Sequence, residues 1–377
     1  MEKPVTDSAP AGDLVNATGD QEQHFASAFA LMDTAIARRV FPGAALAVTM
    51  QGRLLAWRGF GHLTYDAASP NVLRETVWDL ASLTKPIAAV SMAMLLHERG
   101  RLSLDTPIVN LLPEFADPSD LRRRTVTARM LLEHSSGLPA HRKLYLENDG
   151  REAMLAAAAR VPLEAAPGER SEYSDIGFIL LGQLLERLAD EREDAFCQRE
   201  VFDPLKLIFR FAPHPRQPIQ FPPTVMDADY RGRIVQGEVN DENASAMGGV
   251  AGHAGLFGDA LSVARFADCI LRGGLPLFRP ETVRLFTTRA THPAGTSRTM
   301  GWDTPSVPSQ SGTRFSPRSF GHLGYTGTSL WCDPERVVSI TLLTNRTWPD
   351  ATNQAIKEVR PAVHDAIMDC VDRSRGR

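Results

Sequence analysis

A serine and a lysine three residues apart mark the place in this chain where covalent chemistry is easiest to build. The segment Ser82-Leu83-Thr84-Lys85 opens an apolar run that predicts a helix over residues 82–96. Because residues i and i+3 are neighbours on a helix surface, the lysine amine can contact the serine hydroxyl and take up its proton. Ser82 is therefore a candidate nucleophile, and Lys85 is its candidate proton partner. The alternative is an ordinary N-cap serine beside a solvated lysine.

A second polar group, Tyr173-Ser174-Asp175, lies immediately before a helical pattern that begins at Ile176. A phenol placed against an ammonium can have its pKa lowered, and it can then act as a base toward a serine or as an acid toward a leaving group. Asp175 could orient Lys85 or a substrate amide. The alternative is that Ser174 or Asp175 only caps the helix while Tyr173 packs at its rim.

Glycines at every third position characterise the segment from Phe320 to Thr328. Glycine weakens a strand, so this spacing indicates close approach of the backbone to a ligand or to another chain segment. We expect an edge strand that can lend a backbone N–H to an oxyanion. The alternative is a bulged edge strand that carries a half-buried His322.

The surrounding patterns predict one sheet built from both ends of the chain, with helices between. Helices are predicted over 23–39 and 351–371, and strands over 44–50, 53–60, 320–332 and 336–345. The strands pair as two hairpins, the first turning at Gln51-Gly52 and the second at Asp333-Pro334. Residues 82–272 have mainly helical patterns.

We therefore expect an α/β fold with an all-α lobe, in which an antiparallel sheet of N- and C-terminal strands is flanked by helices. Residues 1–22 are expected to form a flexible tail and residues 23–377 a single domain. Its α/β lobe comprises about 23–80 and 255–377, and the inserted helical lobe about 81–254. The proline-rich stretch 212–224 predicts a long irregular surface loop of the kind that often shapes a pocket.

Composition narrows the classes of function. The chain has 377 residues with 43% apolar content and a formal net charge of -4, and its arginines are scattered among its acids. We therefore expect a globular protein with no nucleic-acid partner. Its start lacks an apolar signal segment and its apolar runs are too short to span a bilayer, which favours a cytoplasmic protein with no membrane span. The four widely spaced cysteines predict buried thiols.

The three polar segments, in the order SxxK, YxD and HxG, resemble the motifs of the serine β-lactamase and penicillin-binding-protein superfamily. The resemblance covers the chain from about Phe41 to the final helix, and it is strongest to class C-like β-lactamase-related serine hydrolases. Further segments support it at residues 131–138, 201–205, 249–257 and 324–330. Residues 237–244 are similar to a segment of the penicillin-binding protein 4*-like subgroup. The resemblance implies a β-lactamase/transpeptidase-like fold.

The resemblance also implies roles for individual residues. Ser82 is implied to be the acylated nucleophile, Lys85 its proton partner and Tyr173 the general base and acid. The backbone N–H groups of Ser82 and Tyr325 are implied to form the oxyanion hole, next to Gly324. His322 stands where the family's third motif usually has a lysine.

Two residues depart from the usual family pattern. Asp175 replaces an asparagine, and an ionised carboxylate cannot donate an N–H to a substrate carbonyl. His322 is expected to be only partly charged near neutral pH, whereas the usual lysine is a permanent cation suited to a substrate carboxylate. Both departures indicate a specificity other than efficient turnover of penicillins or D-Ala-D-Ala ends.

Three more residues are weaker candidates for the site. His253 lies among glycines with no acid partner suggested by the sequence, which favours a buried turn over a second catalytic histidine. Asp241 and Asn243 could line the pocket or make local turns. The chain has no HExxH, GxSxG, Walker-type or dinucleotide glycine motif, so no metal and no cofactor is expected.

We expect a serine hydrolase that works through an acyl-enzyme on an amide or ester, related to β-lactamases and D-Ala-D-Ala carboxypeptidases. The partner is then a small-molecule or peptide substrate. One alternative is a carboxylesterase or amidase that acts on small molecules. An alternative of another class is a ligand-binding sensor on the same fold that has lost turnover. Substrate identity and oligomeric state do not follow from the sequence.

Overall fold

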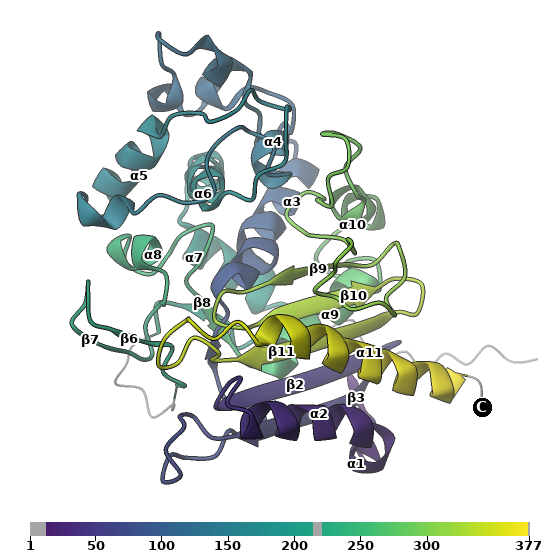
Figure 1. Cartoon of the computed structure of the whole chain (residues 1–377). Helices are drawn as coiled ribbons and strands as arrows, with labels where there is room; N and C mark the ends of the chain where they lie inside the picture. Colours follow the sequence, from purple (N-terminus) through teal and green to yellow (C-terminus); the bar gives the residue numbers. More distant parts are fainter. Residues whose placement is uncertain (1–12, 214–220, 376–377) are drawn as a thin grey trace, which may run out of the picture.

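The computed structural model describes residues 13–213 and 221–375, and its framework is a six-stranded sheet assembled from the two ends of the chain (Figure 1). The strand order is β1-β3-β2-β11-β10-β9. All neighbouring strands are antiparallel except β1 and β3, which run parallel. The strands are β1 (Val15–Asn16), β2 (Gly43–Met50), β3 (Arg53–Gly61), β9 (Phe320–Leu323), β10 (Ser329–Asp333) and β11 (Val338–Thr344).

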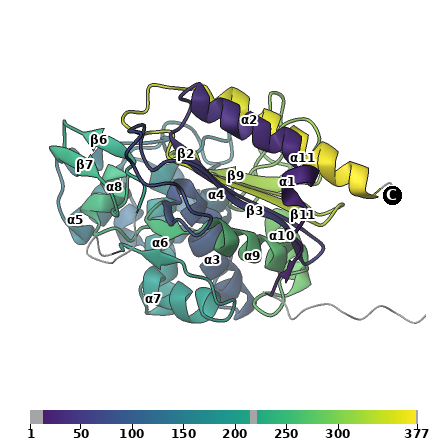
Figure 2. The ribbon, with the colours of Figure 1, turned by 90° about the horizontal axis from the view of Figure 1, so that it is seen from below.

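Helices cover both faces of this sheet. The helices α2 (Ala26–Ala37) and α11 (Ile356–Arg375) lie side by side on one face, which Figures 1 and 2 both show. The helix α9 (Ala260–Leu271) packs on the other face against β2 and β11. Both faces bury apolar side chains, since β2 and β11 are almost wholly buried. Strands buried on two sides read as continuous apolar runs, as these do.

The rest of the chain forms a helical lobe beside the sheet (Figure 1). Its α-helices are α3 (Val90–Glu98), α4 (Ala128–Leu132), α5 (Arg151–Arg160), α6 (Asp175–Ala189), α7 (Glu193–Cys197) and α8 (Glu242–Ala246). The remaining helices are α1 (Gln21–His24) and α10 (Pro280–Thr287). Small sheets of β4 (Trp78–Asp79), β8 (Leu256–Gly258) and β5 (Arg210–Phe211), and of β6 (Val225–Asp227) and β7 (Arg233–Val235), join the two lobes.

The buried helix α6 shows why the lobe folds as it does. Ser174 is its N-cap: the hydroxyl accepts a hydrogen bond from Gly177 N at 3.0 Å and donates one to Pro139 O at 2.6 Å. The apolar residues of 176–185 are buried throughout. A helix that is apolar on all sides belongs in the interior, so α6 forms the centre of the lobe.

Three predicted elements differ from the structure, and a fourth lies mostly outside the described residues. The helix expected over 82–96 is a 3-10 turn (Ala81–Leu83), a π-helical turn (Lys85–Ala89) and then α3. The strand expected over 320–332 is two strands, β9 and β10, because residues 324–328 turn the chain back. The tail expected over 1–22 contains β1 and the start of α1, since Val15 pairs with Arg53. Most of the proline-rich loop expected at 212–224, residues 214–220, lies outside the described residues.

Two further sequence predictions concern the cysteines and membrane-spanning helices. All four cysteines are free and buried thiols, as expected. Within 13–213 and 221–375, no helix combines the length and the apolar character needed to cross a bilayer.

Candidate active site

Ser82 lies at the base of a cavity of about 910 Å³ between the helical lobe and the edge of the sheet. The residue before it, Ala81, has a left-handed φ of 48°, and its N–H donates to the Asp79 carboxylate at 2.8 Å. Non-glycine residues rarely adopt this conformation, so the contacts around Ala81 must hold it. Asp79 is thereby a positioning residue for the turn that presents the serine hydroxyl.

The structure brings Lys85 against Ser82, with 3.1 Å between Nζ and Oγ. The Lys85 side chain is fully buried, and its ammonium also donates to Asp175 Oδ1 at 2.7 Å and to the carbonyl oxygen of His253 at 3.0 Å. Burial alone lowers a lysine pKa, but the Asp175 charge and the hydrogen bonds outweigh it and raise the pKa of Lys85. Lys85 is therefore an ammonium at neutral pH. Asp175 orients it, which the sequence left as one of two possibilities.

Tyr173 completes the group: Lys85 Nζ lies 4.9 Å from the centre of its ring, and Tyr173 lines the cavity together with Ser82. Burial raises the pKa of Tyr173 more than the neighbouring Lys85 charge lowers it. The expectation of a phenol with a lowered pKa is therefore wrong for this resting state, because desolvation of the tyrosinate outweighs the attraction of the ammonium. Tyr173 is a neutral phenol beside an ammonium.

His134 fixes the segment that carries Tyr173. The Ser174 N–H donates to His134 Nδ1 at 3.0 Å, and the His134 and Tyr173 rings lie 4.6 Å apart. Burial holds the pKa of His134 well below its usual value, so the ring stays neutral and its Nδ1 can accept the hydrogen bond. Sequence reasoning placed residue 134 only within a family-like segment and missed this role.

The edge strand β9 forms the opposite wall, as the glycine spacing predicted. Gly324 packs so closely on the turn that carries Ser82 that a Cβ there would lie 2.7 Å from Leu80 O. This close approach explains why position 324 requires glycine. The Tyr325 N–H donates to no acceptor among the described residues, and Tyr325 lines the cavity together with Ser82. It is thus free to act on a substrate carbonyl.

His322 differs from its expected state. It is 3% exposed, and its Nδ1 lies 2.8 Å from Leu323 O, while Nε2 has no partner among the described residues. Burial lowers the pKa of His322 to about 3, so the ring is neutral rather than partly charged near neutral pH. A sequence pattern does not report burial, which decides this state. Arg298 is a second cation near this wall after Lys85, and its guanidinium lies 5.2 Å from the centre of the Tyr173 ring.

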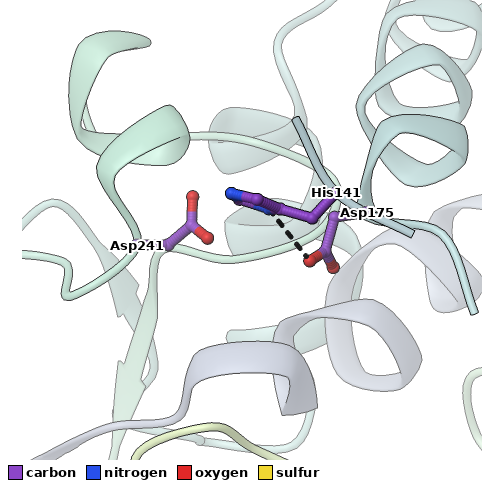
Figure 3. Close-up of side chains that lie close together, drawn as sticks. All are labelled: His141, Asp175 and Asp241. Carbon is purple, nitrogen blue, oxygen red and sulfur yellow. Dashed lines mark ion pairs between the residues drawn. The ribbon is translucent and has the colours of Figure 1, made fainter. Parts of the chain in front are cut away.

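The other side of the cavity holds His141, Asp175 and Asp241, whose ligand-type atoms lie within 4.8 Å of one another (Figure 3). His141 Nδ1 lies 3.8 Å from Asp175 Oδ2, and Asp241 Oδ1 lies 2.8 Å from His253 Nε2. His253 is buried, as the predicted turn implies, but it has an acid partner that the sequence did not suggest, because Asp241 at the start of α8 lies against it. Each carboxylate of this trio already has a basic partner within the protein.

Asn243 lies behind this side of the site rather than in the cavity. It is wholly buried, donates from Nδ2 to Arg142 O at 2.8 Å and accepts from Tyr145 N at 3.2 Å. Asn243 therefore ties loops together, which is the local structural role that the sequence left open. No signal in the sequence pointed to His141 or Arg298, because both lie in irregular segments without a motif.

Comparison with known proteins places this geometry in a family. A family model described as Beta-lactamase matches residues 28–363. A protein of Escherichia coli K12, provisionally named as a D-alanyl-D-alanine carboxypeptidase, is 33% identical over 72% of this chain and 69% of its own. The N-acetylmuramyl-L-alanine amidase of Bacillus subtilis 168 is 32% identical over 81% of this chain and 77% of its own.

Solved structures confirm the predicted fold class. EstCE1, described as a hydrolase with promiscuous acyltransferase activity, superposes with a TM-score of 0.72 at 22% identity, covering 91% of this chain and 99% of EstCE1. A penicillin-binding protein homologue from Caulobacter crescentus gives a TM-score of 0.69 at 20% identity and covers 90% and 96% of the two chains. With its family model matching from α2 into α11, this chain belongs to the beta-lactamase family of serine hydrolases.

Proposed function

We propose that this protein hydrolyses an amide or ester bond of a peptide-like substrate through an acyl-enzyme on Ser82. The observation that carries the proposal is the contact of Ser82 Oγ with a buried Lys85 ammonium at 3.1 Å, in a cavity that Tyr173 also lines. Acyl transfer needs a nucleophile placed against the groups that will take its proton, and these groups must be oriented by a further residue. Asp175 is the further residue here.

Proton transfer in this site requires that the pair of Lys85 and Tyr173, both protonated at rest, first loses one proton. With Lys85 an ammonium and Tyr173 a phenol, neither can accept the serine proton. Once the pair has lost a proton, the form with a tyrosinate beside the ammonium can take the proton of Ser82 as Oγ bonds to the carbonyl carbon. Tyr173 then donates that proton to the leaving group. In deacylation, Tyr173 takes a proton from water as the water oxygen bonds to the acyl carbon. Tyr173 then returns that proton to Ser82 Oγ as the acyl group is released.

The negative charge that develops on the carbonyl oxygen needs donors in the same cavity. We assign this role to the backbone N–H groups of Ser82 and Tyr325. The free Tyr325 N–H and its position in the wall next to Ser82 support the assignment. A preorganised donor of this kind contributes about 3 kcal/mol to transition-state stabilisation in serine hydrolases.

The names of the two relatives favour a cell-wall peptide or muropeptide as the substrate class. A second candidate is a small ester, and the neutral His322 favours it because the usual cation of the third motif is missing. A D-Ala-D-Ala peptide, N-acetylmuramyl-L-alanine and a short 4-nitrophenyl ester should be compared at equal enzyme concentration, with Ser82→Ala as the control. We expect the highest kcat/KM on one of the two amides. A dominant ester activity would replace the first candidate by the second.

The same assay tests the non-catalytic alternative. A sensor on this fold would bind or be acylated once and release nothing further. Multiple turnovers per enzyme molecule, absent in Ser82→Ala, are expected here. A single stoichiometric burst without turnover would contradict the proposed hydrolase.

A further inference from the structure

The end of the cavity beyond Tyr325 contains two buried arginines that pair with no acidic side chain among the described residues. Arg346 is 7% exposed and Arg360 4% exposed, and both line the same cavity as Ser82. Arg346 follows β11, and Arg360 lies in the first part of α11. Buried charges are normally paired, because removing a cation from water is costly. Two unpaired guanidinium groups in one cavity therefore need an explanation.

The contacts of Arg346 are all with neutral groups. Its Nε donates to Tyr325 O at 2.9 Å, its Nη1 donates to Ala351 O at 3.2 Å, and its guanidinium lies 4.7 Å from the centre of the Tyr325 ring. These contacts orient the guanidinium and leave its charge uncompensated. Arg346 is thus held in place next to the strand end that carries the proposed oxyanion donor.

Arg360 is less satisfied still. Its Nη1 donates to Gln310 Oε1 at 3.0 Å, while its Nε has no partner among the described residues. Gln310 is itself oriented, because its Nε2 donates to Lys357 O at 3.2 Å. Burial and the nearby Arg346 charge lower the pKa of Arg360 to about 10, so Arg360 remains a cation at neutral pH.

A hydroxyl in the same end of the cavity also lacks a partner. Thr347 lines the cavity, its side chain is fully buried, and its Oγ1 makes no hydrogen bond within the described residues. A buried polar atom without a partner is rare in native structures. The unpaired donors of Arg360 and Thr347 both belong to one cavity, and Lys357 adds a third cation to its lining.

A buried arginine elsewhere in the chain shows what a purely structural role looks like. Arg123 is 2% exposed, and its guanidinium donates to three backbone carbonyls, those of Phe115, Ala159 and Val161. Its hydrogen bonds tie three segments together. The Arg360 guanidinium instead donates to one side-chain oxygen, that of Gln310, and its Nε has no partner among the described residues. Packing alone therefore does not account for Arg360.

We propose that Arg346, Thr347 and Arg360 form an anion subsite that binds a carboxylate of the substrate away from the bond that is cleaved. Guanidinium groups bind carboxylates through paired N–H donors, and a threonine hydroxyl adds a further donor. The subsite rests on the proposed function, since it shares its cavity with Ser82. It gives the enzyme a preference for acidic substrates that the neutral His322 cannot supply.

Matched pairs of esters test the subsite. Mono-4-nitrophenyl glutarate and 4-nitrophenyl pentanoate differ by a carboxylate on the acyl side, and 3-carboxyphenyl acetate and phenyl acetate differ by one on the leaving side. The measured quantity is the ratio of kcat/KM for the anionic ester to that for its neutral partner. In at least one pair, Arg360→Gln should lower this ratio about tenfold, because a charge-assisted hydrogen bond is lost. Thr347→Val should lower it less, and Arg360→Lys should retain part of it.

Two controls separate recognition from structure. Arg192→Gln removes the same charge from an exposed arginine outside the cavity and should leave both ratios unchanged. A merely structural role for Arg360 would instead lower the melting temperature and reduce both esters of a pair equally. Ratios that change less than about twofold in Arg360→Gln would overturn the subsite. Esters cleaved no faster by the wild type than by Ser82→Ala would contradict the proposed function itself, and the subsite with it.

Discussion

The Lys85 ammonium and the Asp175 carboxylate lie 2.7 Å apart and form the ion pair at the centre of the site. Position 175 is one of the two places where the sequence departs from the family pattern, and the ion pair depends on that departure. Asp175 raises the pKa of Lys85 and also that of Tyr173, because a negative charge favours the protonated form of both. The identity of residue 175 therefore sets the pH at which the pair can lose a proton.

Asp175→Asn should shift the pH profile of kcat/KM to lower pH. In the wild type the rate should rise with pH above neutrality, since both members of the pair hold their protons there. Removing the carboxylate lowers both pKa values, so the rising limb should move to lower pH. Steady-state kinetics from pH 6 to pH 10 measure this, with Asp194→Asn as an exposed control. An unmoved or upward-shifted limb would show that Asp175 does not govern the proton transfer.

Tyr173→Phe should lower kcat by a factor of about 100 to 10,000, the usual contribution of general acid–base catalysis. The ring is kept, so packing against His134 should survive and the melting temperature should change little. Tyr65→Phe is the matched control, because it removes a tyrosine hydroxyl that donates to Arg39 O at 2.9 Å and lies outside the cavity. A Tyr173→Phe enzyme with near wild-type kcat would remove the phenol from the mechanism.

Gly324→Ala should impair catalysis by displacing the turn that presents Tyr325. The added methyl group would press on Leu80 O and on the Thr328 hydroxyl, so the backbone must move. We expect at least a tenfold loss of kcat/KM, corresponding to about 1.4 kcal/mol. Gly19→Ala, where a Cβ meets open space, should keep full activity. Equal activity of both variants would refute the close approach at position 324.

Part of this site follows from local sequence rules, and part does not. The contact of Ser82 with Lys85 was predicted correctly from spacing, even though the helix there begins with 3-10 and π turns. Spacing works because one turn of any helix brings such residues together. The β2–β3 hairpin also followed from Gln51-Gly52, since both residues have the positive φ that this turn needs.

Burial and contacts between distant loops were beyond the sequence. The raised pKa of Tyr173 and the neutral state of His322 depend on how deeply each lies in the assembled fold. The contact of His253 with Asp241 depends on two loops meeting. Arg346 lies in a loop and Arg360 in a helix, and the sequence showed both only as members of a scattered set of arginines. Tertiary structure alone separates these residues from their exposed counterparts.

Glu193 provides a prediction for stability rather than catalysis. It is 1% exposed, neither carboxylate oxygen has a partner among the described residues, and burial raises its pKa to about 8. A glutamate whose folded pKa is raised favours folding below its unfolded pKa, and this contribution is lost as pH rises toward 8. Glu193→Gln should therefore match the wild type near pH 4.5 and exceed its melting temperature by pH 8.

Thermal unfolding at both pH values measures this difference, with the exposed Glu75→Gln as the control. The gain should grow steadily with pH, because glutamine stays neutral throughout. A constant difference between Glu193→Gln and the wild type would indicate lost packing instead of titration.

Labelling of the nucleophile tests the central claim most directly. The protein should be treated with a fluorophosphonate, and intact mass followed by peptide mapping should locate the adduct. We predict one adduct per chain, on Ser82, with no labelling of Ser82→Ala and a strongly slowed reaction in Tyr173→Phe. An adduct on another residue, or substrate hydrolysis that persists in Ser82→Ala, would contradict the account.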